Sequence, residues 1–273
     1  MKITRRGFLV GGLLGLSSCA QLDRIRPDIS LPDVPLTGPD TFSFATIGDT
    51  HLVDARSTAP LARAVGALAA NEQVQFVVML GDLSEHGTLE QLGLASTSLA
   101  RLEQPYYAVP GNHDVLLGGA EPLANFTQRF DTTHWRESDG GWALLGLNTC
   151  VGREQVVTVP EEELAWLDAQ LERINTDRPI ALFTHHPLNP TTADWRVENA
   201  EAILARFGTH KLRLVASGHY HGNTEEQVGD VLFCTTACCS LTRENHDGTT
   251  AKGFRLFHVD GETVTTEFVE VAV

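Results

Sequence analysis

The sequence has few cysteines and few basic residues, which argues against a structural zinc protein and against a nucleic-acid-binding protein. Its 273 residues include five cysteines, and no two have the C-x-x-C spacing of a structural zinc site. Lys and Arg number 20 against 35 Asp and Glu, giving a formal net charge of -15, which argues against a nucleic-acid backbone as the main partner. No internal repeat or low-complexity segment is present. The remaining composition is that of an ordinary globular protein, with 42% hydrophobic residues and a length that permits a sizeable core.

The sequence also lacks an apolar run long enough to cross a membrane, but its first residues are typical of an export signal. Residues 1–6 are basic, and residues 7–16 form a short apolar stretch rich in glycine. Because about 20 apolar residues are needed to span a bilayer, this stretch favours a secretory signal. Residues 4–9 resemble the twin-arginine export motif, the alternative being a coincidental Arg5-Arg6 pair.

A lipid anchor is predicted at Cys19. Residues 16–19 resemble a lipoprotein box, in which cleavage leaves Cys19 as a lipidated N-terminus; the alternative is an ordinary signal-peptidase site after Ala20. The following residues, up to 40, contain four prolines and little periodicity, as in an extended tether. We therefore expect a signal peptide over residues 1–18, a lipid-anchored tether over 19–40 and one domain over 41–273, in a bacterial protein exported to the periplasm or cell envelope.

The other cysteines, Cys150, Cys234, Cys238 and Cys239, lie late in the chain and do not resemble a disulfide framework. Two interpretations stay open: they are small buried residues in strands, or one disulfide forms within the 234–239 group, which an oxidising compartment would permit. Adjacent Cys238 and Cys239 could pair only in strained geometry, so we do not predict that bond.

From residue 41 onward, strand-like apolar runs alternate with helical patterns. The helical patterns cover residues 59–70, 89–103, 160–174 and 197–207. Pro160 followed by three glutamates suits a helix start, because proline fits the first turn and acidic side chains complement the helix dipole. Such alternation predicts an α/β fold in which helices cover a sheet.

After residue 221 the pattern changes to short β-like runs. They cover residues 225–228, 231–235, 253–259 and 263–271. Gly229-Asp230 separates the first two runs, and Asp260-Gly261 separates the last two. Such pairs between alternating runs are hairpin signals. We therefore predict a second, largely antiparallel sheet at the C-terminus.

Five apolar runs end in residues that can bind metals. The runs cover residues 41–47, 74–80, 106–110, 179–183 and 211–216. The polar residues that follow them are Asp49, His51, Asp82, Asn112, His113, Asp114, His185, His219 and His221. In open α/β sheets, ligands bind beyond the carboxyl ends of the strands. The pattern therefore predicts a polynuclear metal site at those ends.

The spacing of these residues suggests their roles. Asp49 and His51 are two residues apart, as are His219 and His221, and an extended chain would point both members of each pair to one side. The two oxygens of Asp82 suit a bridge between two cations. Nitrogen and oxygen ligands without thiolate indicate Mn, Fe or Zn rather than Ca. Each residue alone would more often be a surface residue, a helix cap or a turn; their conjunction favours the metal site.

Together these residues resemble the signature of the calcineurin-like metallophosphoesterase superfamily. The matching blocks, in order over residues 44–221, are Asp49-x-His51, Gly81-Asp82, Gly111-Asn112-His113-Asp114, His185 and Gly218-His219-x-His221. The form His185-His186-Pro187 is most similar to the branch of cyclic-nucleotide and glycerophosphodiester phosphodiesterases, although Leu188 stands where that branch often has a second proline.

The resemblance implies a four-layer α/β/β/α sandwich with two mixed sheets and a dimetal site at the C-terminal ends of the strands. It also implies two ligand groups that share one carboxylate: Asp49, His51, Asp82 and His221 for one metal, and Asp82, Asn112, His185 and His219 for the other. His113 resembles the histidine that stabilises or protonates the leaving group, and Asp114 would orient its imidazole.

The function implied is dimetal-dependent hydrolysis of a small phosphate ester, preferentially a diester, by a metal-activated hydroxide. The alternatives are a broad phosphomonoesterase and a non-catalytic, metal-binding surface lipoprotein; the spare His113 favours an enzyme. His86 and His186 are weaker candidates for substrate contact. Specificity is expected from the loops 115–120 and 189–196, and the oligomeric state is left open.

Overall fold

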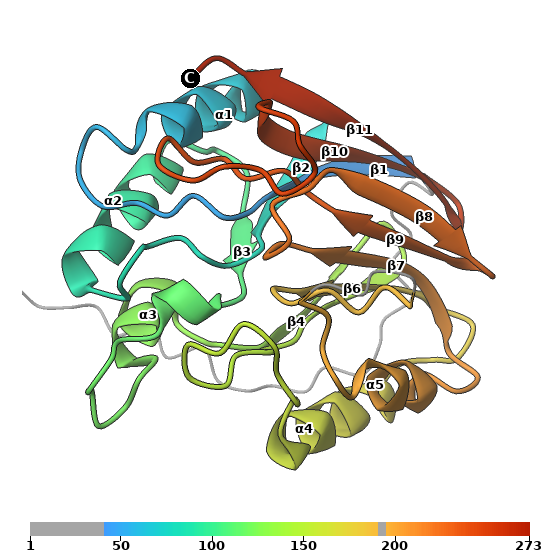
Figure 1. Ribbon diagram of the computed structural model, residues 1–273. Coiled ribbons are helices and arrows are strands. Elements are labelled where there is room, and N and C mark those ends of the chain that lie inside the picture. The colour runs from blue at the N-terminus through green and yellow to red at the C-terminus, as the bar shows by residue number, and fades with distance from the viewer. Residues whose placement is uncertain (1–40, 191–194) are drawn as a thin grey trace, which may run out of the picture. The chain divides into compact units, whose positions relative to one another are not determined.

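Two mixed β-sheets lie face to face, and helices cover both outer faces (Figure 1). The computed structural model describes residues 41–190 and 195–273, so the predicted signal peptide, Cys19 and the tether lie outside the described residues. The strands are β1 (Thr41–Ile47), β2 (Val74–Met79), β3 (Tyr106–Ala108), β4 (Trp135–Asp139), β5 (Trp142–Gly146), β6 (Pro179–Thr184), β7 (Lys211–Ser217), β8 (Thr224–Val228), β9 (Val231–Thr235), β10 (Lys252–Asp260) and β11 (Thr263–Val271). The helices are α1 (Ala59–Ala69), α2 (Leu89–Leu99), α3 (Ala124–Phe130), α4 (Glu161–Leu171) and α5 (Ala200–Arg206), with a short 3-10 turn η1 (Asn112–Asp114).

The order of the strands makes four layers. The first sheet runs β11-β10-β1-β2-β3 and the second β4-β5-β6-β7-β9-β8. In Figure 1, α1, α2 and α3 lie beside the first sheet, and α4 and α5 lie beyond the second. The central strands β1, β2, β3 and β5, β6, β7, β9 pair in parallel, and the outer ones pair antiparallel. The predicted α/β/β/α sandwich with two mixed sheets is confirmed.

Aromatic side chains fill the space between the sheets. In β2, Phe76 points into this inner core and Val77 points toward the helices, as the two-residue period of a strand requires. Phe44 stacks between Phe76 and Phe257, with ring centroids 4.8 and 4.7 Å apart, and Phe183 of the other sheet meets it edge-on at 5.7 Å. Full burial of one such side chain contributes about 1.5–3 kcal/mol, so this layer holds the two sheets together.

All four predicted helices are present, each shorter than its pattern suggested. The Thr88 hydroxyl caps α2 by accepting a hydrogen bond from the Gln91 amide at 3.3 Å. The sequence did not predict α3 or β4; only Phe126 of α3 is fully buried, so that helix has little apolar periodicity. Among the described residues, no helix is long and apolar enough to cross a membrane.

The predicted separate antiparallel sheet at the C-terminus is wrong. Both of its hairpins are present, but β8 and β9 extend the second sheet beside β7, whereas β10 and β11 extend the first sheet beside β1. Each hairpin covers a strand that would otherwise expose unpaired backbone groups. Hairpin signals are local in the sequence, whereas the choice of sheet edge depends on tertiary contacts.

The four cysteines of the described region are free thiols, so no disulfide joins them. Cys234, Cys238 and Cys239 are buried, and Cys150 is half-buried. Burial raises the pKa of Cys234 and of Cys239 to about 12. The interpretation of small buried residues in strands is therefore correct for Cys234, which lies in β9; Cys238 and Cys239 are buried but lie outside the strands, and Cys150 is neither fully buried nor in a strand.

Candidate metal centre

The seven residues predicted as metal ligands meet at one edge of the two sheets, where the parallel strands end. All seven are buried. They follow β1 (Asp49 and His51), β2 (Asp82), β3 (Asn112), β6 (His185) and β7 (His219 and His221). Both sheets therefore contribute donors to one site.

Four of these residues form the first group of donors. His51 Nε2 lies 3.4 Å from Asp82 Oδ2 and 3.1 Å from His221 Nε2. His221 Nε2 in turn lies 3.5 Å from Asp49 Oδ1. All four donor atoms lie within 4.8 Å of one another. They are the residues that the resemblance assigned to one metal.

The second group shares Asp82 with the first. His185 Nε2 lies 3.4 Å from Asp82 Oδ1, the other oxygen of that carboxylate, and 3.1 Å from Asn112 Oδ1. His219 Nδ1 lies 3.1 Å from the same His185 nitrogen. A cation about 2.0–2.2 Å from each ligand requires ligand atoms about 3–3.5 Å apart, so both groups fit a metal ion. The two oxygens of Asp82 face different groups, as a bridging carboxylate must.

The side chains reach the site through left-handed turns, not through the extended backbone that we predicted. Five of the seven residues have positive φ: Asp49 at 55°, His51 at 45°, Asp82 at 51°, His219 at 65° and His221 at 50°. Each such residue costs about 1–2 kcal/mol, so the surroundings must hold it in place. Backbone hydrogen bonds do so: the Asp49 amide donates to the Gly81 carbonyl (3.0 Å) and the His51 amide to the Asp82 carbonyl (2.9 Å).

Each histidine of the site turns one ring nitrogen inward and bonds the other to an acceptor outside. The pairs are His51 Nδ1 with Glu85 Oε2 (3.1 Å), His185 Nδ1 with the Leu80 carbonyl (2.8 Å), His219 Nε2 with the Gln155 carbonyl (2.9 Å) and His221 Nδ1 with the Glu244 carbonyl (3.1 Å). Such partners fix the tautomer of the neutral ring, whose inward nitrogen is then a lone-pair donor. The sequence did not indicate these partners, because three of them are backbone carbonyls.

The electrostatics of the site favour a bound cation. Burial raises the pKa of Asp82, but attraction to His185 and His51 outweighs burial and brings that pKa well below its usual range. Burial lowers the pKa of His185, but the charge of Asp82 raises it to about 9. Burial and repulsion from His185 lower the pKa of His219 to about 4. The buried carboxylates thus attract positive charge, and the donor set supplies nitrogen and oxygen atoms for it.

His113 stands beside the ligand cluster without belonging to either group. Its amide donates to Asp82 Oδ1 at 2.8 Å, and its ring lies edge-on to that of His51, 4.7 Å away. Its Nδ1 is 3.3 Å from Glu85 Oε1 and 2.7 Å from Arg153 Nη2. With Nδ1 held in this way, Nε2 is the ring nitrogen left for a substrate.

Asp114 does not orient the His113 ring, contrary to the prediction. Its carboxylate accepts hydrogen bonds from the amides of Leu83 (3.2 Å), Ser84 (2.8 Å) and Gly111 (2.9 Å), and from the Ser84 hydroxyl (2.9 Å). Asp114 therefore joins the loop after β2 to the turn after β3. The prediction failed because sequence proximity does not show which way a side chain points.

The carboxylate that contacts the His113 ring is that of Glu85, not that of Asp114. The sequence did not predict a role for Glu85. Its carboxylate contacts His51, His113 and Arg243, the last through Nε at 3.1 Å and also through Nη2. Burial raises the pKa of Glu85, but hydrogen bonds from these three side chains outweigh burial and hold it well below its usual range. Glu85 is therefore an ionised link between His51, a predicted metal ligand, His113 and Arg243 in the segment between β9 and β10.

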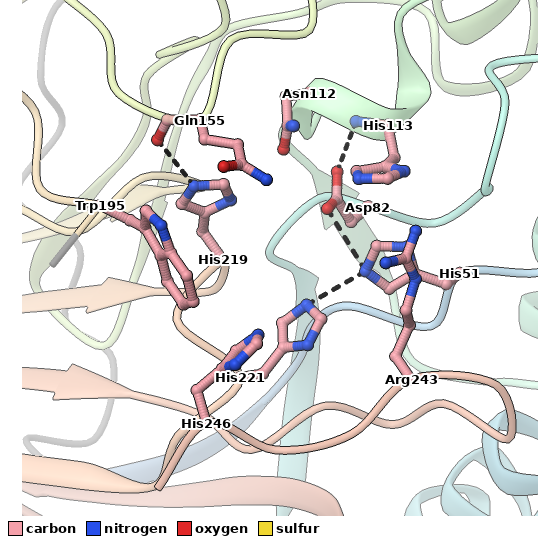
Figure 2. Close-up of a pocket in the computed structure, with 10 residues that line it drawn as sticks. All are labelled: His51, Asp82, Asn112, His113, Gln155, Trp195, His219, His221, Arg243 and His246. Carbon is pink, nitrogen blue, oxygen red and sulfur yellow. Dashed lines mark hydrogen bonds and ion pairs between the residues drawn. The ribbon is translucent and has the colours of Figure 1, made fainter.

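A cavity of about 120 Å³ opens over the two ligand groups (Figure 2). Its walls include five residues named above as donors, His113, and four that were not named individually from the sequence: Gln155, Trp195, Arg243 and His246. Trp195 belongs to the loop 189–196 from which specificity was expected. The loop 115–120, His86 and His186 are not among the lining residues. His86 is exposed, and the His186 ring is buried, with Nδ1 2.9 Å from the Thr149 hydroxyl.

Comparisons with known proteins agree with this geometry. The family model described as calcineurin-like phosphoesterase matches residues 42–223. A Xenorhabdus bovienii protein named "Probable cyclic nucleotide phosphodiesterase" is 25% identical over 173 residues, which are 62% of this chain and 70% of that protein. An Arcobacter nitrofigilis protein named "Probable glycerophosphodiester phosphodiesterase" is 31% identical over 120 residues, 41% of each chain. Among solved structures, a dimetal phosphatase from Danio rerio shares the fold, with a TM-score of 0.62 and 19% identity over 84% of this chain and 99% of that one.

Proposed function

The chain belongs to the calcineurin-like phosphoesterase family, and we propose that it hydrolyses small phosphodiesters with two metal ions held by the seven ligands. The observation that carries this proposal is the shared carboxylate: the two oxygens of Asp82 face separate donor groups. His113 is held on the same carboxylate, beside the site but outside both groups. A histidine that stands beside the ligands without being one of them suits a hydrolase better than a structural metal site.

The donors fit manganese, iron or zinc, because they are imidazole, carboxylate and amide groups without thiolate. When bound, a pair of such cations supplies charge stabilisation for the phosphoryl group and a water nucleophile whose pKa is lowered toward ~7. Asp49, His51, Asp82 and His221 would hold one ion. Asp82, Asn112, His185 and His219 would hold the other.

The protein's own contribution is to position groups around the phosphate. Asp82 fixes the distance between the two donor groups and holds the His113 amide. Because Glu85 and Arg153 hold His113 Nδ1, its Nε2 is available to give a proton to the departing alcohol oxygen. The acceptors bonded to the outward nitrogens of the ligand histidines keep the inward nitrogens in place when the charge of the site changes during hydrolysis.

Apart from the two metal ions, the cavity has few cationic side chains to offset a second phosphate charge, which supports a preference for diesters. Arg243 is the one arginine or lysine among the described residues that line the cavity, and it is already paired with Glu85. A monoester dianion carries one more negative charge than a diester, and the chain around it has a formal net charge of -15. Two of the similar proteins are named phosphodiesterases, which supports the same preference.

The test compares the purified full-length chain with its Asp82→Asn variant. We expect the wild type to bind two manganese, iron or zinc ions per chain and to hydrolyse diesters faster than monoesters. The variant should lose most of the metal and nearly all activity, because an amide cannot bridge two cations. Faster turnover of monoesters would favour the phosphomonoesterase alternative. Bound metal without turnover of any ester would favour a binding module.

We also propose that the chain is exported and lipid-anchored, on the evidence of Arg5-Arg6 and Cys19. Replacing both arginines with lysine should leave precursor in the cytoplasm, and Cys19→Ala should abolish lipid labelling. Unchanged export of the lysine variant would contradict the twin-arginine route. A wild-type chain without lipid would contradict the anchor.

A further inference from the structure

The cavity over the metal site has two unlike walls (Figure 2). His113 and Asn112 stand on one side, and Trp195 and His246 stand together on the opposite side. His246 comes from the segment between β9 and β10, beyond the residues 42–223 that match the family. The second wall is therefore a feature of this chain that its ligand motifs do not specify.

Trp195 and His246 pack edge to face at the border of the cavity. Their ring centroids are 4.4 Å apart at an interplanar angle of 70°. Trp195 also meets the ligand His219 edge-on at 5.9 Å, and His246 lies 5.1 Å from the ligand His221. Each ring thus lies against one of the two histidines that follow β7, at the border of the metal site.

The backbone holds Trp195 in a costly conformation. Its φ is 56°, in the left-handed region that bulky residues rarely adopt and that costs about 1–3 kcal/mol. The indole is only half-buried, so burial of its surface compensates this cost in part. A strained, half-buried tryptophan that lines a cavity is typical of a residue kept for contact with a ligand.

A buried lysine fixes the segment that carries His246. Lys252 Nζ donates to the Arg243 carbonyl (2.8 Å), to Asn245 Oδ1 (3.1 Å) and to Cys238 Sγ (3.0 Å). Asn245 Nδ2 donates to the Ala251 carbonyl at 2.7 Å, which closes the segment on itself. The His246 amide also donates to the His221 carbonyl at 3.3 Å. The backbone that carries His246 is therefore held in place before any substrate arrives, and an organised wall binds with a smaller loss of entropy.

We propose that Trp195 and His246 form a subsite for the alcohol group that remains on the phosphate after cleavage, and that it selects a planar aromatic group such as a nucleobase over glycerol. This inference rests on the proposed phosphodiesterase function. The departing oxygen lies at His113, so the other ester group extends toward the opposite wall. Stacking of a base on an aromatic side chain is worth roughly 5–100-fold in binding.

The test uses two diesters with the same leaving group, the nitrophenyl ester of thymidine 5′-phosphate and the nitrophenyl ester of its abasic analogue, 1,2-dideoxyribose 5-phosphate. Both retain a primary alkyl oxygen on phosphorus and neither has a hydroxyl on the adjacent carbon that could attack phosphorus, so their intrinsic reactivity is similar. We expect wild-type kcat/KM to be about tenfold or more higher for the thymidine ester. Trp195→Leu and His246→Ala should bring this ratio close to one, mainly through KM. Trp195→Phe, which keeps a ring, should preserve most of the preference.

The control variant is Leu117→Ala, which removes an exposed apolar side chain from a loop that does not line the cavity. It should leave the ratio unchanged. A wild type without preference for the thymidine ester, or variants that lose rate equally on both esters, would overturn the subsite. Calorimetric binding of thymidine 5′-phosphate against glycerol phosphate tests it without turnover. If neither ester is cleaved while the thymidine compound still binds more tightly, the proposed function fails and the subsite stands.

Discussion

At the scale of single residues, Glu85 connects the metal site to the histidine beside it. Its carboxylate contacts His51 Nδ1 at 3.1 Å and His113 Nδ1 at 3.3 Å, and it pairs with Arg243. Asp114, in contrast, bonds backbone amides and one hydroxyl of the surrounding loops. The two carboxylates act on different parts of the structure, so substitution of Glu85 should affect catalysis and substitution of Asp114 should affect stability.

We expect Glu85→Gln to lower kcat/KM by about 10–100-fold, because a neutral amide holds His51 and His113 less firmly. Asp114→Asn should instead lower the melting temperature, because an amide presents one acceptor oxygen where the carboxylate presents two. The measurements are kcat/KM and Tm for both variants, with metal content determined on the same samples. If Glu85→Gln lowered Tm as much as Asp114→Asn and left kcat/KM unchanged, Glu85 would be a structural residue only.

His113→Ala separates proton donation from positioning. General acid catalysis supplies roughly 10²–10⁴-fold, and an alkoxide leaving group needs it far more than a nitrophenolate does. The variant should keep both metals, since all seven ligands remain, and should lose much more kcat/KM on an alkyl diester than on a nitrophenyl diester. Equal losses on the two esters with metals retained would mean that His113 only positions the substrate.

At the scale of elements, the sequence predicted where the strands end but not how the chain turns there. Residues such as Asp49 and His219 were expected to continue an extended strand, yet both are left-handed. A strand can be recognised in the sequence from its apolar residues, because burial repeats every two residues along a strand. A turn of one or two polar residues has no repeat, and its conformation depends on hydrogen bonds to the neighbouring loop, such as that between the Asp49 amide and the Gly81 carbonyl.

Gly111 shows how tightly these turns are packed. A Cβ at this position would lie 2.1 Å from the amide nitrogen and from Oδ1 of Asp82. We expect Gly111→Ala to displace the bridging carboxylate, so that metal binding and activity are lost and Tm falls. Gly66→Ala in α1 is the matched control, because a Cβ there meets nothing within 4 Å. The control should raise stability by about 0.5–1 kcal/mol and keep activity, measured by denaturant unfolding and diester hydrolysis. A Gly111→Ala variant that kept both metals would contradict the packing argument.

At the scale of the whole molecule, the site depends on both sheets. Asp49, His51, Asp82 and Asn112 follow strands of one sheet, and His185, His219 and His221 follow strands of the other. The sequence could predict this convergence because all of these strands are parallel and open at the same edge. It could not predict the wall formed by Trp195 and His246, because neither residue follows a strand end and their contact joins distant segments.

Because the ligands come from both sheets, bound metal should stabilise the folded molecule as a whole. The unfolded chain has no assembled site, so metal at about 100 times its Kd adds ~2.7 kcal/mol to the free energy of unfolding. For a domain of this size we expect a chelator to lower Tm by about 5–10 °C and added Mn²⁺ to restore it. The measurement is thermal unfolding of the full-length chain with and without chelator. Asp82→Asn is the control: without the bridging carboxylate, its Tm should hardly respond to metal. A response in the variant equal to that of the wild type would show that the stabilising metal binds elsewhere, and the two-group assignment would have to be abandoned.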